Sequence, residues 1–385
     1  MQPDRFRRSP DSTLWPADDA GLAALVACLD AGGAPAVGRD GTVGCRPSAI
    51  PQLFVETSGS TGRAKTIRRS QASWIASFGV NRDLFGLGAT DCYATLGALG
   101  HSLTLYATLE ALFLGADLRA LAGLAPRYQL QALQPATVLY ATPSQLRLLL
   151  AGAGTAVRAG MRLVMVGGGT LDPVLRAGLT RLFPAADIRE FFGAAETSFL
   201  TLSDPQTPAG SVGRAYPGVT LDIRDGTTPA APGVAGEIWA ASPYLFDGYD
   251  SGDSRDTRRE GAFLSIGEMG LLDSAGYLIL KGRKTRMIRV AEHSVFPEDV
   301  ERLLATDPAV TLCAVIPEAD ALRGQHLVAV VQGDPACEGR LRTLCRAGLP
   351  AHAAPRRYVF LDTLPLLAAG KPDLQALTET VGGMP

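Results

Sequence analysis

The stretch from residue 53 to residue 182 alternates short apolar runs with longer amphipathic segments, and this alternation constrains the fold more than any other feature. Residues 137–140 and 162–166 are apolar runs of strand length, and segments with helical spacing follow them at 143–150 and 173–182. Repeated strand–helix order is typical of parallel sheets, because parallel neighbours need a crossover connection. The sequence therefore predicts an α/β fold with parallel strands crossed by helices.

The pattern changes on both sides of this region. A helix is predicted over 19–31, where Gly32-Gly33 supplies a stop signal. After Gly210, runs such as 238–240 and 276–280 stand between Gly, Pro and Asp turns. Short strands of this kind are typical of a β-meander or a small barrel, so we expect a small β subdomain attached to the parallel region.

A further change follows Arg283. Helical and strand-like segments then mix, with helices predicted over 298–304 and 338–347 and strands over 310–317 and 326–332. A chain of 385 residues is long enough for more than one domain. We therefore predict a large domain over 1–284 and a small α+β domain over 285–385.

Composition excludes several classes of protein. The formal net charge of −2 provides no basic footprint for nucleic acid. Glu110 and Asp117 interrupt the most apolar region, so no membrane-spanning helix is expected, and the first residues do not resemble a signal peptide. A cytoplasmic protein with neither nucleic-acid nor membrane partners is predicted.

The cysteines and histidines are scattered along the chain, without C-x-x-C pairs. A zinc site or a disulfide framework requires clustering, so reduced and mostly buried thiols are expected. The cysteines are Cys28, Cys45, Cys92, Cys313, Cys337 and Cys345.

The segment from Thr57 to Lys65 reads Thr-Ser-Gly-Ser-Thr-Gly-Arg-Ala-Lys. Glycines and small hydroxylated residues let backbone N–H groups approach an anion, and the lysine adds a positive charge. The spacing differs from that of a Walker loop, which needs a lysine directly after its last glycine. Phosphate binding is the functional interpretation, and a flexible Ser/Gly turn is the alternative.

Further motifs follow this loop in order along the chain. They are Phe192-Gly193-Ala194-Ala195-Glu196, Gly282-Arg283, Pro297-Glu298-Asp299-Val300-Glu301, and Leu364-Pro365 followed by Gly370-Lys371-Pro372-Asp373. Together with the loop, they resemble the adenylate-forming superfamily of acyl-CoA synthetases, aryl-acid ligases and peptide-synthetase adenylation domains. The resemblance implies an adenylate-forming core over 1–284 and a lid domain over 285–385.

The resemblance also implies a chemistry, in which a carboxylate attacks the α-phosphorus of ATP and expels pyrophosphate. Lys65 would grip the phosphates together with the loop residues Thr57, Ser58, Gly59, Ser60, Thr61 and Gly62. Glu196 would hold Mg²⁺, a metal that prefers oxygen ligands. Phe192, flanked by Gly193 and Ala195, would stack on adenine, whereas Glu268 and Arg283 would bind the ribose. Lys371 would reach the reacting carboxylate from the small domain.

The acid pocket is expected beside Gly167, Gly168 and Gly169 and near Phe191 and Ser198. His101 stands where relatives often place a residue near the substrate carboxylate, although a buried core histidine is the alternative interpretation. No aspartate follows His101 at the position that pairs with the ammonium group of amino-acid substrates. An aryl or fatty carboxylic acid is therefore favoured over an α-amino acid.

Four departures from the family pattern stand out. The phosphate loop lies early in the chain, which predicts a shortened N-terminal region. Glu268 replaces the usual aspartate, and Thr285 stands at the hinge position, where it provides no ion pair. Residues 291–294, Ala-Glu-His-Ser, replace a glycine-containing turn that lines the pantetheine tunnel.

A glutamate in that turn would obstruct and repel a CoA thiol arm. Adenylation is therefore better supported than thioester formation, and the acceptor is left open among CoA, an acyl carrier protein and an amine. The alternative to an enzyme is a catalytically impaired relative that binds nucleotide or acyl-adenylate as a binding or partner protein.

Overall fold

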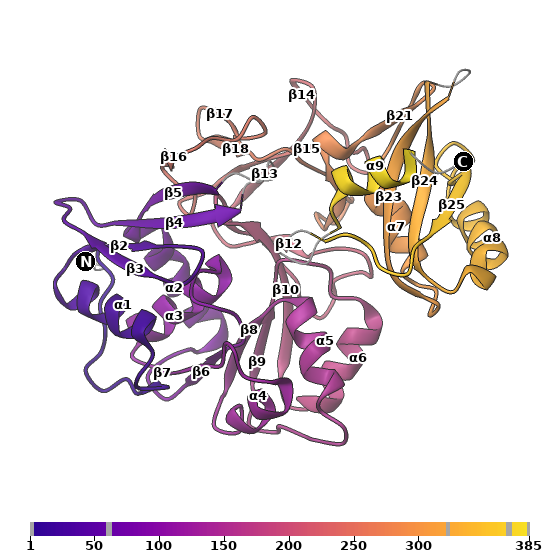
Figure 1. Cartoon of the computed structure of the whole chain (residues 1–385). Coiled ribbons are helices and arrows are strands. Elements are labelled where there is room, and N and C mark those ends of the chain that lie inside the picture. The colour runs from indigo at the N-terminus through magenta and orange to yellow at the C-terminus, as the bar shows by residue number, and fades with distance from the viewer. Residues whose placement is uncertain (1–3, 59–63, 321–323, 367–371, 383–385) are drawn as a thin grey trace.

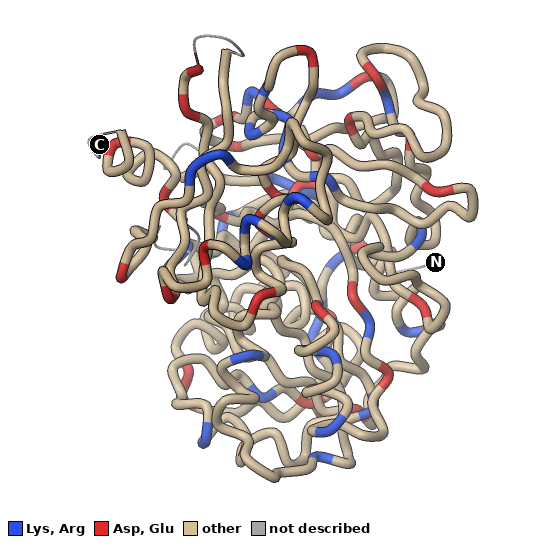
Figure 2. The backbone as a smooth tube through the Cα atoms, turned by 90° about the vertical axis from the view of Figure 1, so that its right-hand side faces the viewer, with Lys and Arg blue, Asp and Glu red and all other residues tan. Residues whose placement is uncertain are grey.

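The computed structural model describes residues 4–58, 64–320, 324–366 and 372–382. In Figure 1 the elements up to β20 form the larger part of the molecule, and the elements from β21 to the C-terminus gather beside it. Basic and acidic residues are interspersed along the tube in Figure 2, in keeping with the nearly balanced composition. None of the helices within the described ranges is long and apolar enough to cross a membrane.

An eight-stranded sheet forms the centre of the larger part, and its first six strands in spatial order are parallel, as predicted. The last two strands pair antiparallel. The order is β1 (Leu14–Trp15), β7 (Asp117–Ala120), β6 (Cys92–Thr95), β8 (Val138–Ala141), β9 (Leu163–Val166), β10 (Asp187–Ala194), β11 (Ser198–Leu202) and β12 (Arg214–Ala215).

Helices cover both faces of this sheet. The residues at their N-termini explain why the helix bounds predicted from the sequence are close to the observed ones. Thr142 caps α5, and Asp172 caps α6 by accepting the Leu175 N–H at 2.9 Å, with a proline at the first helical position each time. The crossover helices are α3 (Ser102–Leu114), α4 (Pro126–Ala132), α5 (Pro143–Ala151) and α6 (Pro173–Leu182).

A second sheet has the order β16-β5-β4-β2-β3, and α2 packs between it and α3. Its elements are α1 (Ala20–Asp30), β2 (Ala34–Val37), β3 (Val43–Arg46), β4 (Gln52–Ser58), β5 (Ala64–Ser70), α2 (Gln71–Phe85) and β16 (Gly248–Ser251). Helix α1 is the helix predicted over 19–31, and Asp19 is its N-cap.

The expectation that all thiols are reduced is wrong for one pair, because Cys28 and Cys45 form a disulfide. Cys28 lies near the end of α1, and Cys45 lies opposite Pro35 in the β2–β3 hairpin, which returns the chain to the helix. The pairing therefore depends on a tertiary contact that the sequence spacing did not reveal. The thiols of Cys313, Cys337 and Cys345 are free and buried, as expected, and Cys92 is partly exposed.

The region after Gly210 forms an antiparallel sheet, as the short strands predicted. Its strands are β13 (Thr220–Asp225), β14 (Thr228–Pro229), β15 (Gly236–Ala241), β17 (Arg258–Glu260), β18 (Phe263–Ser265), β19 (Glu268–Leu272) and β20 (Leu278–Arg283).

The C-terminal part is a small α+β unit with a three-stranded sheet of order β23-β24-β25 and a separate hairpin, β21–β22. Its elements are η1 (Lys284–Arg286), β21 (Ile288–Val290), β22 (His293–Val295), α7 (Pro297–Leu304), β23 (Val310–Asp320), β24 (Gly324–Gly333), η2 (Pro335–Cys337), α8 (Glu338–Gly348), β25 (Arg357–Phe360) and α9 (Leu374–Gly382).

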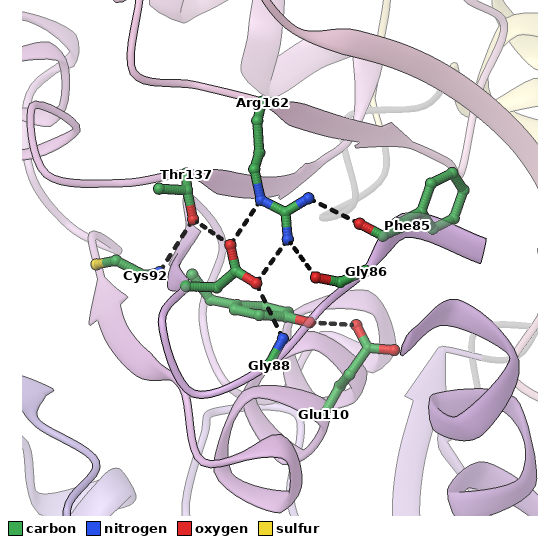
Figure 3. Close-up of polar contacts among 9 residues, drawn as sticks. Phe85, Gly86, Gly88, Cys92, Glu110, Thr137 and Arg162 are labelled. Atoms are coloured by element: carbon green, nitrogen blue, oxygen red, sulfur yellow. Dashed lines mark hydrogen bonds and ion pairs between the residues drawn. The ribbon is translucent and has the colours of Figure 1, made fainter. Parts of the chain in front are cut away.

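Two polar clusters brace the parallel sheet, and Figure 3 shows both. At the amino end of β9, Arg162 pairs with Asp91 at 2.6 Å and donates to the Phe85 carbonyl at 2.7 Å. Deeper in the core, the completely buried Glu110 accepts hydrogen bonds from Tyr140 at 2.6 Å and Tyr93 at 3.2 Å. These contacts tie α2, α3 and the strands into one rigid layer.

Candidate active site

Several of the predicted site residues follow the carboxyl ends of parallel strands. His101 comes after β6, Gly167–Gly169 follow β9, and Glu196 follows β10. Because β6, β8, β9 and β10 run parallel as neighbours, these ends meet at one edge of the sheet. Ligands in open α/β sheets bind at this edge, which makes it the candidate active site.

The loop that carries Glu196 is a tight turn between β10 and β11. A Cβ atom at Gly193 would lie 1.8 Å from the Ser198 carbonyl oxygen, so only glycine fits there. The Ala194 N–H donates to the Thr197 hydroxyl at 3.0 Å, and Ser198 has a left-handed φ of 57°. These constraints give the loop from Gly193 to Ser198, here called the Glu196 loop, one defined shape.

Tyr249 contacts both Glu196 and Lys65. The Tyr249 hydroxyl donates to Glu196 Oε1 at 3.0 Å, and the Lys65 Nζ lies 5.7 Å from the centroid of the Tyr249 ring. Burial, and then the charge of Glu196, raise the pKa of Tyr249, which keeps its hydroxyl protonated as a donor. The structure thus brings together two predicted residues through a tyrosine that sequence reasoning missed.

The predicted phosphate loop connects β4 and β5. Thr57 pairs with Lys65 across this hairpin, and the Thr57 hydroxyl donates to the Lys65 carbonyl at 3.5 Å. Ser58 pairs with Ala64. The predicted residues Gly59, Ser60, Thr61 and Gly62 lie outside the described residues, as does Lys371.

The predicted ribose pair is formed in the third sheet. Glu268 lies opposite Arg283 in the β19–β20 register, and the Arg283 guanidinium is 3.0 Å from Glu268 Oε1. The longer glutamate side chain therefore still reaches the arginine. A carboxylate paired with a guanidinium at a strand end presents both an acceptor and donors to a ribose diol.

Phe191 and Phe192 point to opposite faces of β10, as successive strand residues do. The Phe191 ring packs against Phe199 in a tilted arrangement, with centroids 4.4 Å apart, and occupies the space above Gly167, where a Cβ would lie 2.2 Å from its Cζ. Phe192 packs against a separate apolar cluster that contains Val212. The two phenylalanines therefore pack in different apolar clusters.

The remaining predicted residues surround this edge. His101 is exposed and precedes α3 at its N-cap position, so the alternative of a buried core histidine is wrong. Gly168 has a left-handed φ of 79°, which favours glycine. Ala195 packs partly buried against the cluster around Ile67. The Ser198 hydroxyl accepts a hydrogen bond from Arg69 at 3.1 Å.

The expected hinge residue Thr285 lies between two cations with different partners. Lys284 pairs with Glu237 of β15 at 3.0 Å, whereas Arg286 pairs with Glu301 of α7 at 2.6 Å. Thr285 itself lines an open pocket of about 340 Å³ together with both Glu237 and Lys284. The residues directly before and after Thr285 therefore form ion pairs, one with β15 and one with α7, which the sequence interpretation did not anticipate.

Tyr249 and Arg69 are the residues that sequence reasoning missed. Arg69 could have been placed from strand alternation, since residues 65, 67 and 69 of β5 share one face. Tyr249 approaches through the pairing of β16 with β5, in which it lies opposite Ile67. No signal in the sequence predicts that long-range pairing.

The donor set of the site fits a magnesium nucleotide. Glu196 offers carboxylate oxygens of the kind that Mg²⁺ prefers, and the Lys65 amine, which lies over the Tyr249 ring, offers charge to phosphate groups. The Glu268–Arg283 pair provides the polar contacts that a ribose would need. Each group is held by contacts within the chain before any ligand binds.

Residues 53–250 match the AMP-binding enzyme family, and residues 299–371 match the AMP-binding enzyme C-terminal domain. The chain is 31% identical to an uncharacterized acyl-CoA ligase of Bacillus subtilis, over 82% of this chain and 65% of that protein. It is 32% identical to the indoleacetate–CoA ligase of Aromatoleum aromaticum, over 96% of this chain and 75% of that protein. The chain thus spans about two thirds to three quarters of these relatives.

Among solved structures, the fold is similar to that of the O-succinylbenzoate coenzyme A synthetase of Bacillus subtilis in complex with ATP and magnesium. The TM-score is 0.76 at 22% identity, and the similarity covers 85% of this chain and 69% of that one. The α/β architecture with a large and a small part is therefore shared.

Proposed function

Because the chain belongs to the AMP-binding enzyme family, we propose that it is an acid–AMP ligase that uses ATP and Mg²⁺ to activate an aryl or fatty carboxylic acid. The single observation that carries this proposal is that Tyr249 contacts both the Glu196 carboxylate and the Lys65 amine at the carboxyl edge of the parallel strands. A carboxylate and an amine on either side of one tyrosine are groups that a metal-bound polyphosphate needs.

The nucleotide would lie between three groups of residues. Lys65 and the loop from Thr57 to Gly62 bind the phosphates, and Glu196 holds Mg²⁺. Glu268 and Arg283 bind the ribose, as their ion pair supports. Phe192 contacts the adenine, and its neighbours Gly193 and Ala195 shape the loop beside it.

In the proposed reaction, a carboxylate oxygen of the acid attacks the α-phosphorus, and the bond to the pyrophosphate oxygen breaks. A C–O–P anhydride forms and pyrophosphate leaves with the electron pair. Both reactants are anions, so the chain must hold them together and offset their charge. Lys65 offsets charge on the leaving phosphates, and Lys371 is proposed to do so at the reacting carboxylate, brought by the lid domain 285–385.

The acid would lie near His101 and the glycines Gly167, Gly168 and Gly169. Phe191 and Ser198 border this region, and the ring of Phe191 continues through Phe199 into an aromatic core. Aromatic side chains in this region support an aryl or fatty acid as the substrate class.

The acceptor of the acyl group is proposed to be a thiol, either of CoA or of the phosphopantetheine of an acyl carrier protein. The β21–β22 turn bears on this choice. Ala291 adopts a left-handed φ of 52°, which glycine favours, and Glu292 beside it is exposed. A negative charge at this turn disfavours the highly anionic CoA and supports the carrier protein as acceptor.

The test is pyrophosphate exchange into ATP with a panel of benzoates, hydroxycinnamates and fatty acids. We expect exchange with at least one acid, abolished by Lys371→Ala but retained by Arg346→Ala, which removes an exposed cation from α8 in the same domain. Tight nucleotide binding without exchange across the panel would instead favour a binding protein. Absence of nucleotide binding would refute both.

A further inference from the structure

Arg69 is completely buried, although its side-chain hydrogen bonds to described residues go to a hydroxyl and a backbone carbonyl rather than to a carboxylate. It lies on β5 and shares one strand face with Lys65 and Ile67. That face contacts the region of the Glu196 loop, since Ile67 packs in one cluster with Ala194 and Ala195. The guanidinium is therefore buried beneath the candidate active site.

The contacts of this guanidinium are few and directional. One terminal nitrogen donates to the Ser198 hydroxyl at 3.1 Å, and the other donates to the Tyr244 carbonyl at 2.8 Å. The guanidinium carbon lies 4.7 Å from the Trp74 ring. The Nε atom has no hydrogen-bond partner among the described residues. Arg69 thus makes two hydrogen bonds and one ring contact where five N–H donors are available.

Burial lowers the pKa of Arg69 to about 9, and the charges of Asp247 and Glu196 oppose this shift. The guanidinium is therefore charged at neutral pH. Burying a charge is costly even with carboxylates nearby, and an apolar side chain of similar size would often stabilise the fold more. We therefore expect Arg69 to matter less for the stability of the fold than for the position of the two segments that accept its hydrogen bonds.

Both acceptors belong to segments that hold the Glu196 loop. Ser198 ends the loop in its left-handed conformation, and its carbonyl occupies the space that Gly193 leaves free. Tyr244 stands two residues before Phe246, whose N–H donates to the Glu196 carbonyl at 2.8 Å. Arg69 therefore joins the end of the loop to the segment that fixes the backbone of Glu196.

We propose that Arg69 is a positioning residue that fixes the Glu196 loop so that the Glu196 carboxylate is presented to Mg²⁺ of the nucleotide. This inference rests on the proposed function. Arg69 acts on the backbone of the loop, whereas Tyr249 orients the carboxylate itself. Because the guanidinium is completely buried, its proposed action is through the loop.

The test compares ATP binding with and without Mg²⁺ by titration calorimetry for the full chain and its Arg69→Leu variant. In the variant, the gain in ATP affinity on adding Mg²⁺ falls by about tenfold, while affinity in EDTA is unchanged, because a displaced carboxylate costs metal binding alone. Arg69→Lys recovers part of the gain, since an ammonium can donate to one of the two acceptors.

Arg162→Leu is the matched control, since it removes a structural arginine at the amino end of β9 (Figure 3). It lowers the melting temperature and leaves the Mg²⁺ gain unchanged. If Arg69→Leu does not fold, Ser198→Ala decides the matter by removing one acceptor, with a smaller loss of the same gain. If Mg²⁺ increases ATP affinity equally in the wild type and in the Arg69 and Ser198 variants, this inference alone is overturned. If Mg²⁺ does not increase the ATP affinity of the wild type, the proposed function is overturned.

Discussion

Replacing Glu110 with glutamine is expected to remove a pH-dependent loss of stability that the wild-type protein carries. Glu110 is completely buried on α3 and accepts hydrogen bonds from Asn81, Tyr93 and Tyr140, which lie on three other elements. Burial raises the pKa of its carboxyl from 4.5 to about 7, although the hydrogen bonds oppose that shift. The folded protein therefore holds a proton that the unfolded chain releases near pH 4.5.

The sign and size of the effect follow from this difference. A carboxyl whose folded pKa is raised stabilises the fold fully below its unfolded pKa, and that stability is lost as the pH rises through the folded pKa. Moving the pKa of Glu110 from 4.5 to about 7 corresponds to about 3 kcal/mol, most of which is lost between pH 5 and pH 8. Glutamine keeps the shape of the protonated form, with one accepting oxygen and one donating group, but does not titrate.

Urea unfolding followed by tryptophan fluorescence measures the effect, because Trp74 packs on Tyr106 in the same core, with ring centroids 5.1 Å apart. The free energy of unfolding of the wild type minus that of Glu110→Gln should fall by about 3 kcal/mol from acid to alkaline pH. Burial also raises the pKa of Glu190 to about 7. Because Glu190 is present in both proteins, its contribution to the free energy of unfolding cancels in the difference. A difference that is flat between pH 5 and pH 8, or that rises, would refute the reasoning.

Three further predictions concern the Glu196 loop, the β21–β22 turn and the disulfide. Gly193→Ala places a Cβ against the Ser198 carbonyl and should slow pyrophosphate exchange by on the order of 100-fold, because a small misplacement of Glu196 is costly. Glu292→Gly removes a negative charge from the turn and should raise the rate of CoA thioester formation about tenfold, and an unchanged rate would show that Glu292 is no obstacle. Cys45→Ala should lower the free energy of unfolding by about 3 kcal/mol without reductant, because the bridge closes a loop of 17 residues, whereas wild type and variant should converge under dithiothreitol.

Local patterns predicted the secondary structure of the larger part well, for a physical reason. The apolar runs at 137–140 and 162–166 became β8 and β9, which are buried on both faces. Alternate residues go to opposite cores: Val138 packs with the aromatic layer around Tyr106, and Leu139 packs with the helices on the other face. Caps and prolines fixed where α5 and α6 begin, so short-range signals were sufficient.

The contacts that shape the site were beyond such signals, because each depends on segments distant in sequence. Tyr249 reaches Glu196 only because β16 pairs with β5, and Arg69 reaches Ser198 across 129 residues. The resemblance in motifs predicted Lys65 and Glu196 as site residues but not Tyr249, which contacts both. Spacing along the sequence does not predict which segments of different sheets will meet. The motif residues specify which chemistry the site can perform, and the buried contacts decide where those residues are held. The Arg69 and Glu110 variants therefore probe positions that motif reading passes over, because one alters the Glu196 loop and the other the core beneath it.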